Sequence, residues 1–279
     1  MKQLRLILIP IVLAYLTIVA LYVGFQRSLI FHPTPSSGVT PKFYSLDYQD
    51  VYFPSSDGVT LNGWCIQHPR SGKKRPFLLY CHANGDNLSD LANVTRLFYD
   101  DGFDMFFFDY RSYGNSQKAP VSEAALDRDA LSAYQWVKAK GISDDRIILW
   151  GHSLGSSVAA WLATQTHPAG LIFEGAFPSI YDVNRQRNPW LLVLPFMIKD
   201  KFQTASYVQQ RTCPLLEFHA ELDTIIPIQL GQKVFEKAAE PKQWVVVKGI
   251  NHNDFPSVAN QYKPIIQAFV EKCLVGKEL

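Results

Sequence analysis

The sequence predicts an α/β domain with a mostly parallel central sheet and helices on both faces. Three observations carry this prediction. Short apolar segments alternate with longer helical ones, most of the short segments are continuously apolar, and turn residues separate them. The 279 residues are enough for one large domain with a sizeable core. We find no internal repeat that would indicate a different architecture.

Residues 28–43 contain several Pro, Ser and Gly residues, and predict an irregular linker to a single domain over residues 44–279. Tyr48–Phe53 and Val59–Gln67, joined by the turn Ser55–Gly58, predict a hairpin at one edge of the sheet. Right-handed crossovers then connect parallel strands through helices. The expected strands are Pro76–Cys81, Met105–Asp109, Arg146–Trp150, Leu171–Glu174, Pro214–His219 and Trp244–Val247, and the expected helices are Leu88–Asp100, Glu123–Lys140, Leu154–Thr166, Ile228–Ala238 and Val258–Cys273.

The composition excludes several classes of protein. An apolar fraction of 47% and a charged fraction of 19% rule out a disordered chain. The balance of 27 Lys and Arg against 25 Asp and Glu leaves no basic surface for nucleic acid. We therefore expect no nucleic-acid partner, no metal and no cofactor. Four widely spaced cysteines without a CxxC pair argue against a zinc site or a disulfide scaffold: Cys65, Cys81, Cys213 and Cys273.

Residues 1–27 are predicted to form a membrane anchor. Leu6–Phe25 is a run of twenty residues without a charge, which as a helix measures about 30 Å, the thickness of the hydrocarbon layer of a bilayer. Two alternatives compete with this interpretation: a signal peptide cleaved after Ala20, for which the run is long, and a buried core helix. We expect a single membrane span.

The charges around this apolar run predict its orientation. Lys2, Arg5 and the amino terminus precede it, and Arg27 follows it. Because basic residues are retained on the cytoplasmic side, we expect a cytoplasmic N-terminus and a periplasmic, lumenal or extracellular domain. If the domain enters a eukaryotic lumen, Asn87 and Asn93 lie in glycosylation sequons, and the cysteines can pair without a connectivity that the sequence selects.

A serine lies directly after the strand Arg146–Trp150, in the segment Gly151-His152-Ser153-Leu154-Gly155. This is the pattern G-x-S-x-G between a strand and a helix, where the turn is too sharp for a Cβ at either flank. Such a turn exposes the Ser153 hydroxyl and aims the backbone N–H of Leu154 at the same space, where the helix terminus favours an oxyanion. An ordinary glycine-rich turn can carry the same pattern, so further residues must decide.

Two later loops supply the partners that a serine nucleophile needs. Asp223 follows the penultimate predicted strand and His252 follows the last one. The carboxyl ends of parallel strands meet at one edge of a sheet, so we expect both residues near Ser153. His252 is the candidate base, and Asp223 would orient it and stabilise its positive charge. Glu221 and Asp254 are rival acids, which we interpret as solvated or loop-stabilising carboxylates.

A second oxyanion donor is expected in the loop within Tyr80–Asn87, after the first parallel strand. The backbone N–H of Asn84 is the first choice, and that of Ala83 is the second. We interpret His82 as a structural residue of this loop. Cys81 is interpreted as a small buried hydrophobe rather than a nucleophile.

With these motifs in place, the chain resembles the membrane-anchored α/β-hydrolase-domain serine hydrolases. That group includes bacterial inner-membrane hydrolases and eukaryotic protein depalmitoylases and lysolipid lipases. The resemblance runs from the anchor to the last helix, and the segments that carry it are Ser28–Pro33, His82–Asn87 (similar to H-G-N-A-G-N), Asp109–Ser116 (similar to D-Y-R-G-Y-G-x-S), Glu174–Ile180 and His252–Asp254 (H-N-D).

The resemblance implies an α/β-hydrolase fold with a short lid, and it assigns the nucleophile, acid and base to Ser153, Asp223 and His252. The chain departs from the family pattern where Ala83, Ser112 and Ala220 replace glycines. The methyl group of Ala83 restricts the backbone where the oxyanion loop bends, which affects the choice of the oxyanion residue and not the triad.

An insertion over about residues 178–212 lies where the family carries its lid. It contains the apolar run Trp190–Ile198, for which two interpretations stay open. The run is either the wall of an acyl-chain pocket that also touches the bilayer, or a helix packed onto the sheet domain.

The sequence therefore predicts a serine hydrolase that cleaves carboxylic ester or thioester bonds of small or lipid-like acyl substrates through an acyl-enzyme. Two alternatives remain: a serine peptidase on the same fold, and a non-catalytic binding protein on a hydrolase scaffold. No prediction about the oligomeric state follows.

Overall fold

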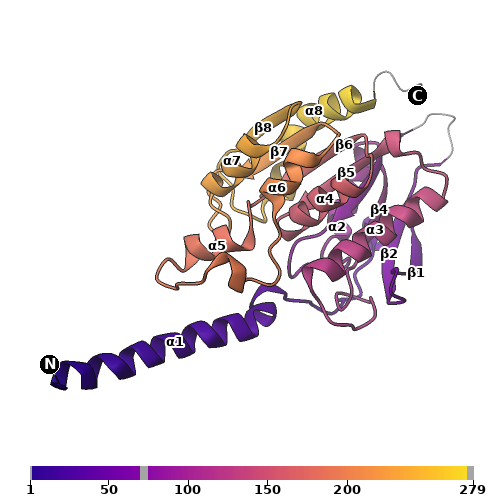
Figure 1. Ribbon diagram of the computed structural model, residues 1–279. Coiled ribbons are helices and arrows are strands. Elements are labelled where there is room, and N and C mark those ends of the chain that lie inside the picture. Colours follow the sequence, from indigo (N-terminus) through magenta and orange to yellow (C-terminus); the bar gives the residue numbers. More distant parts are fainter. Residues whose placement is uncertain (1, 70–74, 275–279) are drawn as a thin grey trace.

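The computed structural model describes residues 2–69 and 75–274, without the side chains of residues 2, 4 and 5. Lys2 and Arg5, on which the predicted orientation depends, therefore lie outside the described side chains. In the described part, one sheet forms the centre of the domain, with the strand order β1-β2-β4-β3-β5-β6-β7-β8 (Figure 1). The strands are β1 (Gln49–Pro54), β2 (Thr60–Ile66), β3 (Phe77–Cys81), β4 (Asp104–Phe108), β5 (Ile147–His152), β6 (Gly170–Glu174), β7 (Leu215–Ala220) and β8 (Lys242–Val247).

The pairing of these strands confirms the predicted fold class. β1 and β2 form an antiparallel hairpin at one edge, and β2 continues the sheet by pairing antiparallel with β4. From β4 to β8 all neighbours are parallel. Parallel neighbours need crossover connections, and helices supply them.

Helices cover both faces of the sheet (Figure 1). One apolar core contains residues from α3, α4, α6 and α7, and the other contains residues from α2 and α8. The helices are α1 (Lys2–Ile30), α2 (Ala92–Asp100), α3 (Glu123–Ala139), α4 (Leu154–Gln165), α5 (Ile180–Arg187), α6 (Thr204–Gln210), α7 (Ile228–Lys237) and α8 (Phe255–Leu274), with 3-10 turns η1 (Pro41–Tyr44), η2 (Asp144–Arg146) and η3 (Pro195–Met197).

Strand β3 explains why the parallel strands are continuously apolar. Phe77, Leu79 and Cys81 belong to the core on the α3 and α4 face, whereas Leu78 and Tyr80 belong to the core on the α2 and α8 face. Successive side chains of a strand point to opposite faces. A strand covered by helices on both faces therefore has no position at which a polar side chain would reach water.

Helix extends into the predicted linker, and the insertion contains helices that we did not predict. Residues 28–30 belong to α1, since no proline or glycine occurs between Arg27 and Pro33 and the N–H of Phe31 still donates to Arg27 O at 2.8 Å. The insertion contains α5 and α6. Ser179 begins α5 because its hydroxyl accepts the N–H of Asp182 at 3.1 Å, which satisfies one of the unpaired donors of the first turn.

Helix α1 extends away from the domain (Figure 1). Its segment Leu6–Ile30 is long and apolar enough to cross a membrane, and almost none of it is buried in the protein. Side chains such as Leu6 and Phe25 are exposed. A core helix would be buried, so the core-helix interpretation of this segment is wrong.

Candidate active site

Ser153 occupies the turn between β5 and α4 in a conformation that few residues adopt. Its backbone dihedral angles are φ 52° and ψ −116°, a strained combination for a residue with a Cβ. The two flanking glycines make this turn sterically feasible. A Cβ on Gly151 would lie 2.4 Å from the carbonyl oxygen of Gly155, and a Cβ on Gly155 would lie 2.0 Å from that of Cys81. The local backbone thus requires the G-x-S-x-G pattern for steric reasons.

The structure brings Asp223 and His252 into direct contact. Asp223 Oδ2 and His252 Nδ1 are 2.6 Å apart, and both side chains are buried. The other carboxylate oxygen, Oδ1, accepts the backbone N–H groups of Ile225 at 2.9 Å and Ile226 at 2.7 Å. These bonds fix the orientation of the carboxylate. An Nδ1–H that donates to Asp223 leaves Nε2 of His252 as the atom that can accept a proton.

The imidazole of His252 packs at the end of β6, which also contacts the serine turn. His252 Nε2 is buried and has no hydrogen-bond partner among the described residues. Its ring packs against Gly175, where an added Cβ would lie 2.9 Å from Cε1 of the imidazole. The residue before Gly175 is Glu174, whose carbonyl oxygen accepts the N–H of Ser153 at 2.8 Å. The end of β6 therefore connects the serine turn with the imidazole.

The charge of Asp223 is stabilised despite its burial. Burial raises the pKa of this carboxyl, but the hydrogen bond and charge of His252, together with the N–H of Ile226, outweigh burial and leave the pKa below its ordinary value. The rival acids have other partners. Glu221 is exposed and pairs with Lys248 Nζ at 2.9 Å, and Asp254 accepts the N–H of Asn251 at 3.0 Å.

Asn251 joins the two loops of this pair, a role that sequence reasoning missed. Its Oδ1 accepts the backbone N–H of Thr224 at 3.0 Å and that of His252 at 2.8 Å. The asparagine thus holds the loop of Asp223 to the loop of His252. Only its position next to His252 could have drawn attention to it, because a single asparagine in a loop has no distinctive pattern.

The expected oxyanion loop lies between β3 and α2, and its side chains connect it to the end of the anchor. Asn84 Nδ2 donates to the carbonyl oxygen of Ile30, while Asn84 Oδ1 accepts the N–H of His32 at 3.0 Å and the hydroxyl of Tyr113 at 2.9 Å. The segment after α1, which the sequence singled out only through a resemblance, thus anchors this loop. Gly85 has φ +91°, so the left-handed turn falls one residue after Asn84.

His82 and Cys81, at the start of this loop, are buried and uncharged. His82 Nδ1 lies 2.8 Å from the carbonyl oxygen of Ala83, and burial lowers the pKa of His82 to about 4. Burial also raises the pKa of the Cys81 thiol to about 12, which leaves it protonated and unreactive. Leu154 begins α4, so its N–H is one of the first-turn donors without an acceptor inside the helix.

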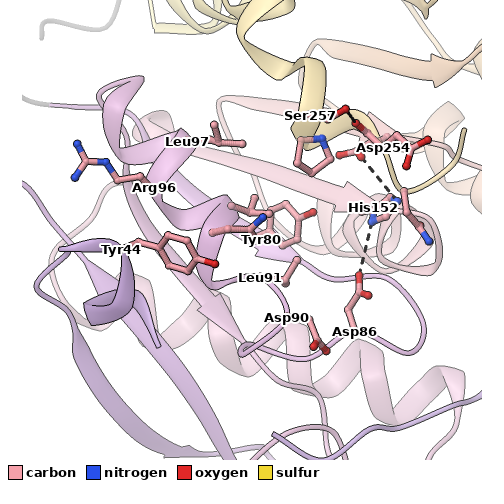
Figure 2. Close-up of a pocket in the computed structure, with 15 residues that line it drawn as sticks. Tyr44, Tyr80, Asp86, Asp90, Leu91, Arg96, Leu97, His152, Asp254 and Ser257 are labelled. Carbon is pink, nitrogen blue, oxygen red and sulfur yellow. Dashed lines mark hydrogen bonds and ion pairs between the residues drawn. The ribbon is translucent and has the colours of Figure 1, made fainter. Parts of the chain in front are cut away.

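A cavity of about 550 Å³ borders this site on the α2 and α8 side (Figure 2). His152, the residue before Ser153, lines it with Nδ1 3.8 Å from Asp86 Oδ2 and Nε2 3.8 Å from Glu174 Oε1. Burial raises the pKa of Glu174. Ser153 and His252 themselves do not line the cavity. Its walls carry the carboxylates Asp86, Asp90, Glu174 and Asp254.

Comparison with known proteins places this arrangement in a family. The sequence model of the alpha/beta hydrolase fold matches residues 76–198, from the start of β3 into the insertion. An uncharacterised protein of Mycobacterium tuberculosis is 35% identical over 232 residues, which cover 82% of this chain and 81% of that protein. The chain belongs to the α/β-hydrolase family.

Two further relatives and one solved structure extend this comparison. Protein bem46 of Schizosaccharomyces pombe is 30% identical over 234 residues, or 77% of each chain. The lysophosphatidylserine lipase ABHD12 of Danio rerio is 34% identical over 190 residues, and the match spans about half of that protein, 48%. An esterase of Pyrococcus furiosus has the same fold, with a TM-score of 0.71 and 19% identity over 88% of this chain and 98% of that one.

These findings support a hydrolase with esterase and lipase relatives and one apolar N-terminal helix, which indicates a single-pass membrane protein. The predicted nucleophile, acid and base all lie at the carboxyl ends of parallel strands, after β5, β7 and β8. In such sheets ligands bind at these ends. Asp223 and His252 form a direct hydrogen bond, and the end of β6 contacts both the backbone of Ser153 and the ring of His252.

Proposed function

We propose that the protein is a membrane-anchored serine hydrolase that cleaves ester or thioester bonds of lipid-like acyl substrates. The observation that carries the proposal is the Asp223–His252 hydrogen bond of 2.6 Å, which leaves the buried His252 Nε2 without a partner among the described residues. The ring packs against Gly175, which follows the residue whose carbonyl oxygen accepts the Ser153 N–H. A buried imidazole nitrogen without a partner is costly unless a reacting group uses it. The proposed user is the hydroxyl of Ser153.

In the proposed reaction, the Ser153 hydroxyl attacks the acyl carbonyl carbon while His252 Nε2 accepts its proton. Asp223 stabilises the resulting imidazolium. The carbonyl oxygen becomes an oxyanion, to which the N–H groups of Leu154 and Asn84 donate, with the N–H of Ala83 as the alternative to Asn84. The leaving alcohol or thiol takes the proton from His252. Water then attacks the acyl-enzyme by the same route and releases the free acid.

The proposed substrate class rests on the relatives and on the apolar character of the insertion. Several relatives are named lysophosphatidylserine lipases. The insertion exposes Trp190, Leu192 and Phe196, side chains that suit contact with acyl chains. We therefore propose single-chain phospholipids and related acyl esters as the first substrates to test.

Covalent labelling tests the serine assignment directly. A fluorophosphonate should label the wild-type protein and should not label Ser153→Ala, because only an activated serine hydroxyl attacks the probe. Absence of labelling in folded wild-type protein would instead indicate a binding protein on a hydrolase scaffold. A panel of p-nitrophenyl esters, acyl thioesters and lysophospholipids of increasing chain length then defines the bond and the acyl preference. Cleavage of peptides alone would indicate a peptidase.

We propose that the N-terminus is cytoplasmic and that the catalytic domain lies on the other side of the membrane. Lys2 and Arg5 before the apolar run outnumber Arg27 after it, and basic residues favour the cytoplasmic side. A topology reporter fused after Leu279 should behave as non-cytoplasmic. A cytoplasmic signal from this fusion would reverse the proposed orientation without affecting the catalytic assignment.

A further inference from the structure

Residues 188–198 of the insertion, here called the insertion loop, divide their apolar side chains between two environments. Leu191, Val193 and Ile198 are buried and form a small apolar cluster with Val19 of α1. Side chains that precede or alternate with them are exposed: Trp190 is 61% exposed, Leu192 67% and Phe196 77%. The buried side chains of the loop pack against α1 and α5, and the run is not a helix over its length, since only Pro195–Met197 forms a 3-10 turn.

Polar groups of α1 satisfy the backbone of the loop. The hydroxyl of Tyr15 donates to the carbonyl oxygen of Trp190 at 3.1 Å and accepts the N–H of Leu192 at 2.7 Å. Gln26 donates to Met197 O at 3.1 Å and accepts the N–H of Lys199 at 2.7 Å. Irregular backbone is tolerated at membrane depth only where other protein groups satisfy it. The contacts with α1 meet this requirement at Trp190 and Leu192 and at the end of the loop.

The position of Tyr15 defines how deep the loop would lie. Tyr15 is twelve residues before Arg27, the first charge after the apolar run, which is about 18 Å along a helix. Arg27 itself pairs with Asp200, after the loop, at 2.7 Å. A helix that spans the roughly 30 Å of hydrocarbon up to Arg27 therefore places Tyr15 near its middle. Trp190 and Leu192, hydrogen-bonded to Tyr15, accompany it.

Exposed basic residues flank the loop on both sides. Arg185 and Arg187 precede it in α5, and Lys199 and Lys201 follow it. An apolar tip with a basic rim is the arrangement that enters the acyl chains of a bilayer while its cations remain near the phosphates.

We propose that the insertion loop inserts beside α1 into the same bilayer from the side that faces the domain, as far as about its middle, as a second membrane contact of the protein. The partner is the acyl-chain layer of that bilayer, and the apolar surface of the loop continues the exposed apolar surface of α1. This inference rests on the membrane location of α1 and does not require catalytic activity. It places the lid region of the hydrolase in contact with the layer in which acyl substrates reside.

Fluorescence quenching of Trp190 tests the insertion in the full-length chain. The protein is reconstituted into phosphatidylcholine and phosphatidylglycerol vesicles whose acyl chains carry bromine, and the wild type is compared with Trp190→Phe. The wild type should lose a larger fraction of its fluorescence than the variant, because Trp190 contacts the brominated chains. Equal fractional losses in the two proteins would overturn the proposal.

Two phenylalanines of matched exposure provide the control. Phe196 is 77% exposed in the loop, and Phe43 is 78% exposed in η1, which packs on α2. Each is replaced by cysteine and labelled with an environment-sensitive fluorophore. The label at 196 should be quenched by brominated lipid and shielded from aqueous iodide, and the label at 43 should show the reverse. Iodide quenching of equal strength at both positions would contradict the insertion.

The native cysteines do not compete for the label. All four are buried, and burial raises the pKa of Cys65 to about 11 and that of Cys81 to about 12. Flotation with vesicles separates the remaining outcomes. A chain that does not float has no membrane anchor, and the inference fails with it. A chain that floats while Trp190 is shielded from iodide but not quenched by bromine has its loop covered by another protein surface, which also overturns the proposal.

Discussion

The serine turn and the insertion loop lie in the same domain but are held in place in opposite ways. The turn at Ser153 is defined by backbone sterics, because a Cβ at Gly151 or Gly155 would collide with backbone atoms. The insertion is held by side chains instead. Glu123 of α3 accepts N–H groups of Lys201 at 2.6 Å and Phe202 at 2.9 Å, and α1 holds the loop itself.

The catalytic geometry and the contact with lipid therefore depend on different parts of the molecule. A catalytic group must keep its geometry within fractions of an ångström, and a turn without sterically allowed alternatives provides such rigidity. A surface that meets lipid needs apolar side chains in contact with a second phase, and peripheral hydrogen bonds are enough to hold it. Changes at the strand ends should therefore abolish turnover with little effect on the insertion. Changes at the insertion should loosen the insertion with little effect on the serine turn.

The largest effect is expected at Ser153. Ser153→Ala should lower kcat by on the order of 10⁴- to 10⁶-fold, since the acyl-enzyme can no longer form. The fold should be retained, because the change removes a single hydroxyl from a half-buried side chain. Ester hydrolysis and circular dichroism measure the two properties. More than a few per cent of the wild-type rate would exclude Ser153 as the nucleophile.

Asp223→Asn should lower activity by on the order of 10⁴-fold, because an amide at this position favours the wrong tautomer of His252 and does not balance its positive charge. The matched controls remove the rival carboxylates. Glu221→Gln and Asp254→Asn should change the rate far less, since neither carboxylate contacts His252 in the described residues. A severe loss in Glu221→Gln with a mild loss in Asp223→Asn would reassign the acid.

Asn251→Ala should lower kcat by about 10- to 100-fold with the serine still labelled by fluorophosphonate, only more slowly. The variant removes the oxygen that accepts the N–H groups of both Thr224 and His252, so the loop of His252 is no longer held to the loop of Asp223. Asn251→Asp, which keeps that acceptor oxygen, should restore most of the rate. Unchanged rates in the alanine variant would show that the two loops need no link.

Glu123→Ala tests the other region of the comparison. The carboxylate accepts the N–H groups of Lys201 and Phe202 and the hydroxyl of Tyr207, and its loss should cost about 1–3 kcal/mol. Hydrogen exchange at residues 201 and 202 should accelerate, while the exchange of Ser153 N–H should not. Glu271→Ala, which removes an exposed carboxylate of α8, is the control. Equal acceleration at Ser153 would mean that the two regions are coupled.

The smallest effect concerns acid stability. Because the pKa of Asp223 is lower in the folded chain than its ordinary value, the carboxylate stabilises the fold above that ordinary value. This stabilisation is lost as the pH falls through the folded-state pKa. The free energy of unfolding of Asp223→Asn should therefore fall less than that of the wild type between about pH 5 and pH 2. If the free energy of unfolding changed with pH to the same extent in both proteins, Asp223 would not contribute to acid stability.

Local sequence patterns predicted most of the fold because they act locally. Continuous apolar segments predicted the parallel strands, and the glycines around Ser153 predicted the turn, since both depend on residues that are neighbours in the chain. Boundaries were less predictable. The last turn of α1 and the helices of the insertion were missed because these helical segments are short, and a short segment carries little periodicity.

The sequence by itself determined the order of elements, the apolar character of α1 and the candidate residues at the strand ends. The sequence favoured Asp223 over the rival carboxylate Glu221, and the tertiary structure shows Asp223 hydrogen-bonded to His252 and Glu221 paired with Lys248. The tertiary structure also decided that Asn251 joins the loops and that the apolar run of the insertion packs against α1. These outcomes depend on contacts between residues up to 177 positions apart, as between Tyr15 and Leu192, and local preferences carry no information about which distant segments meet.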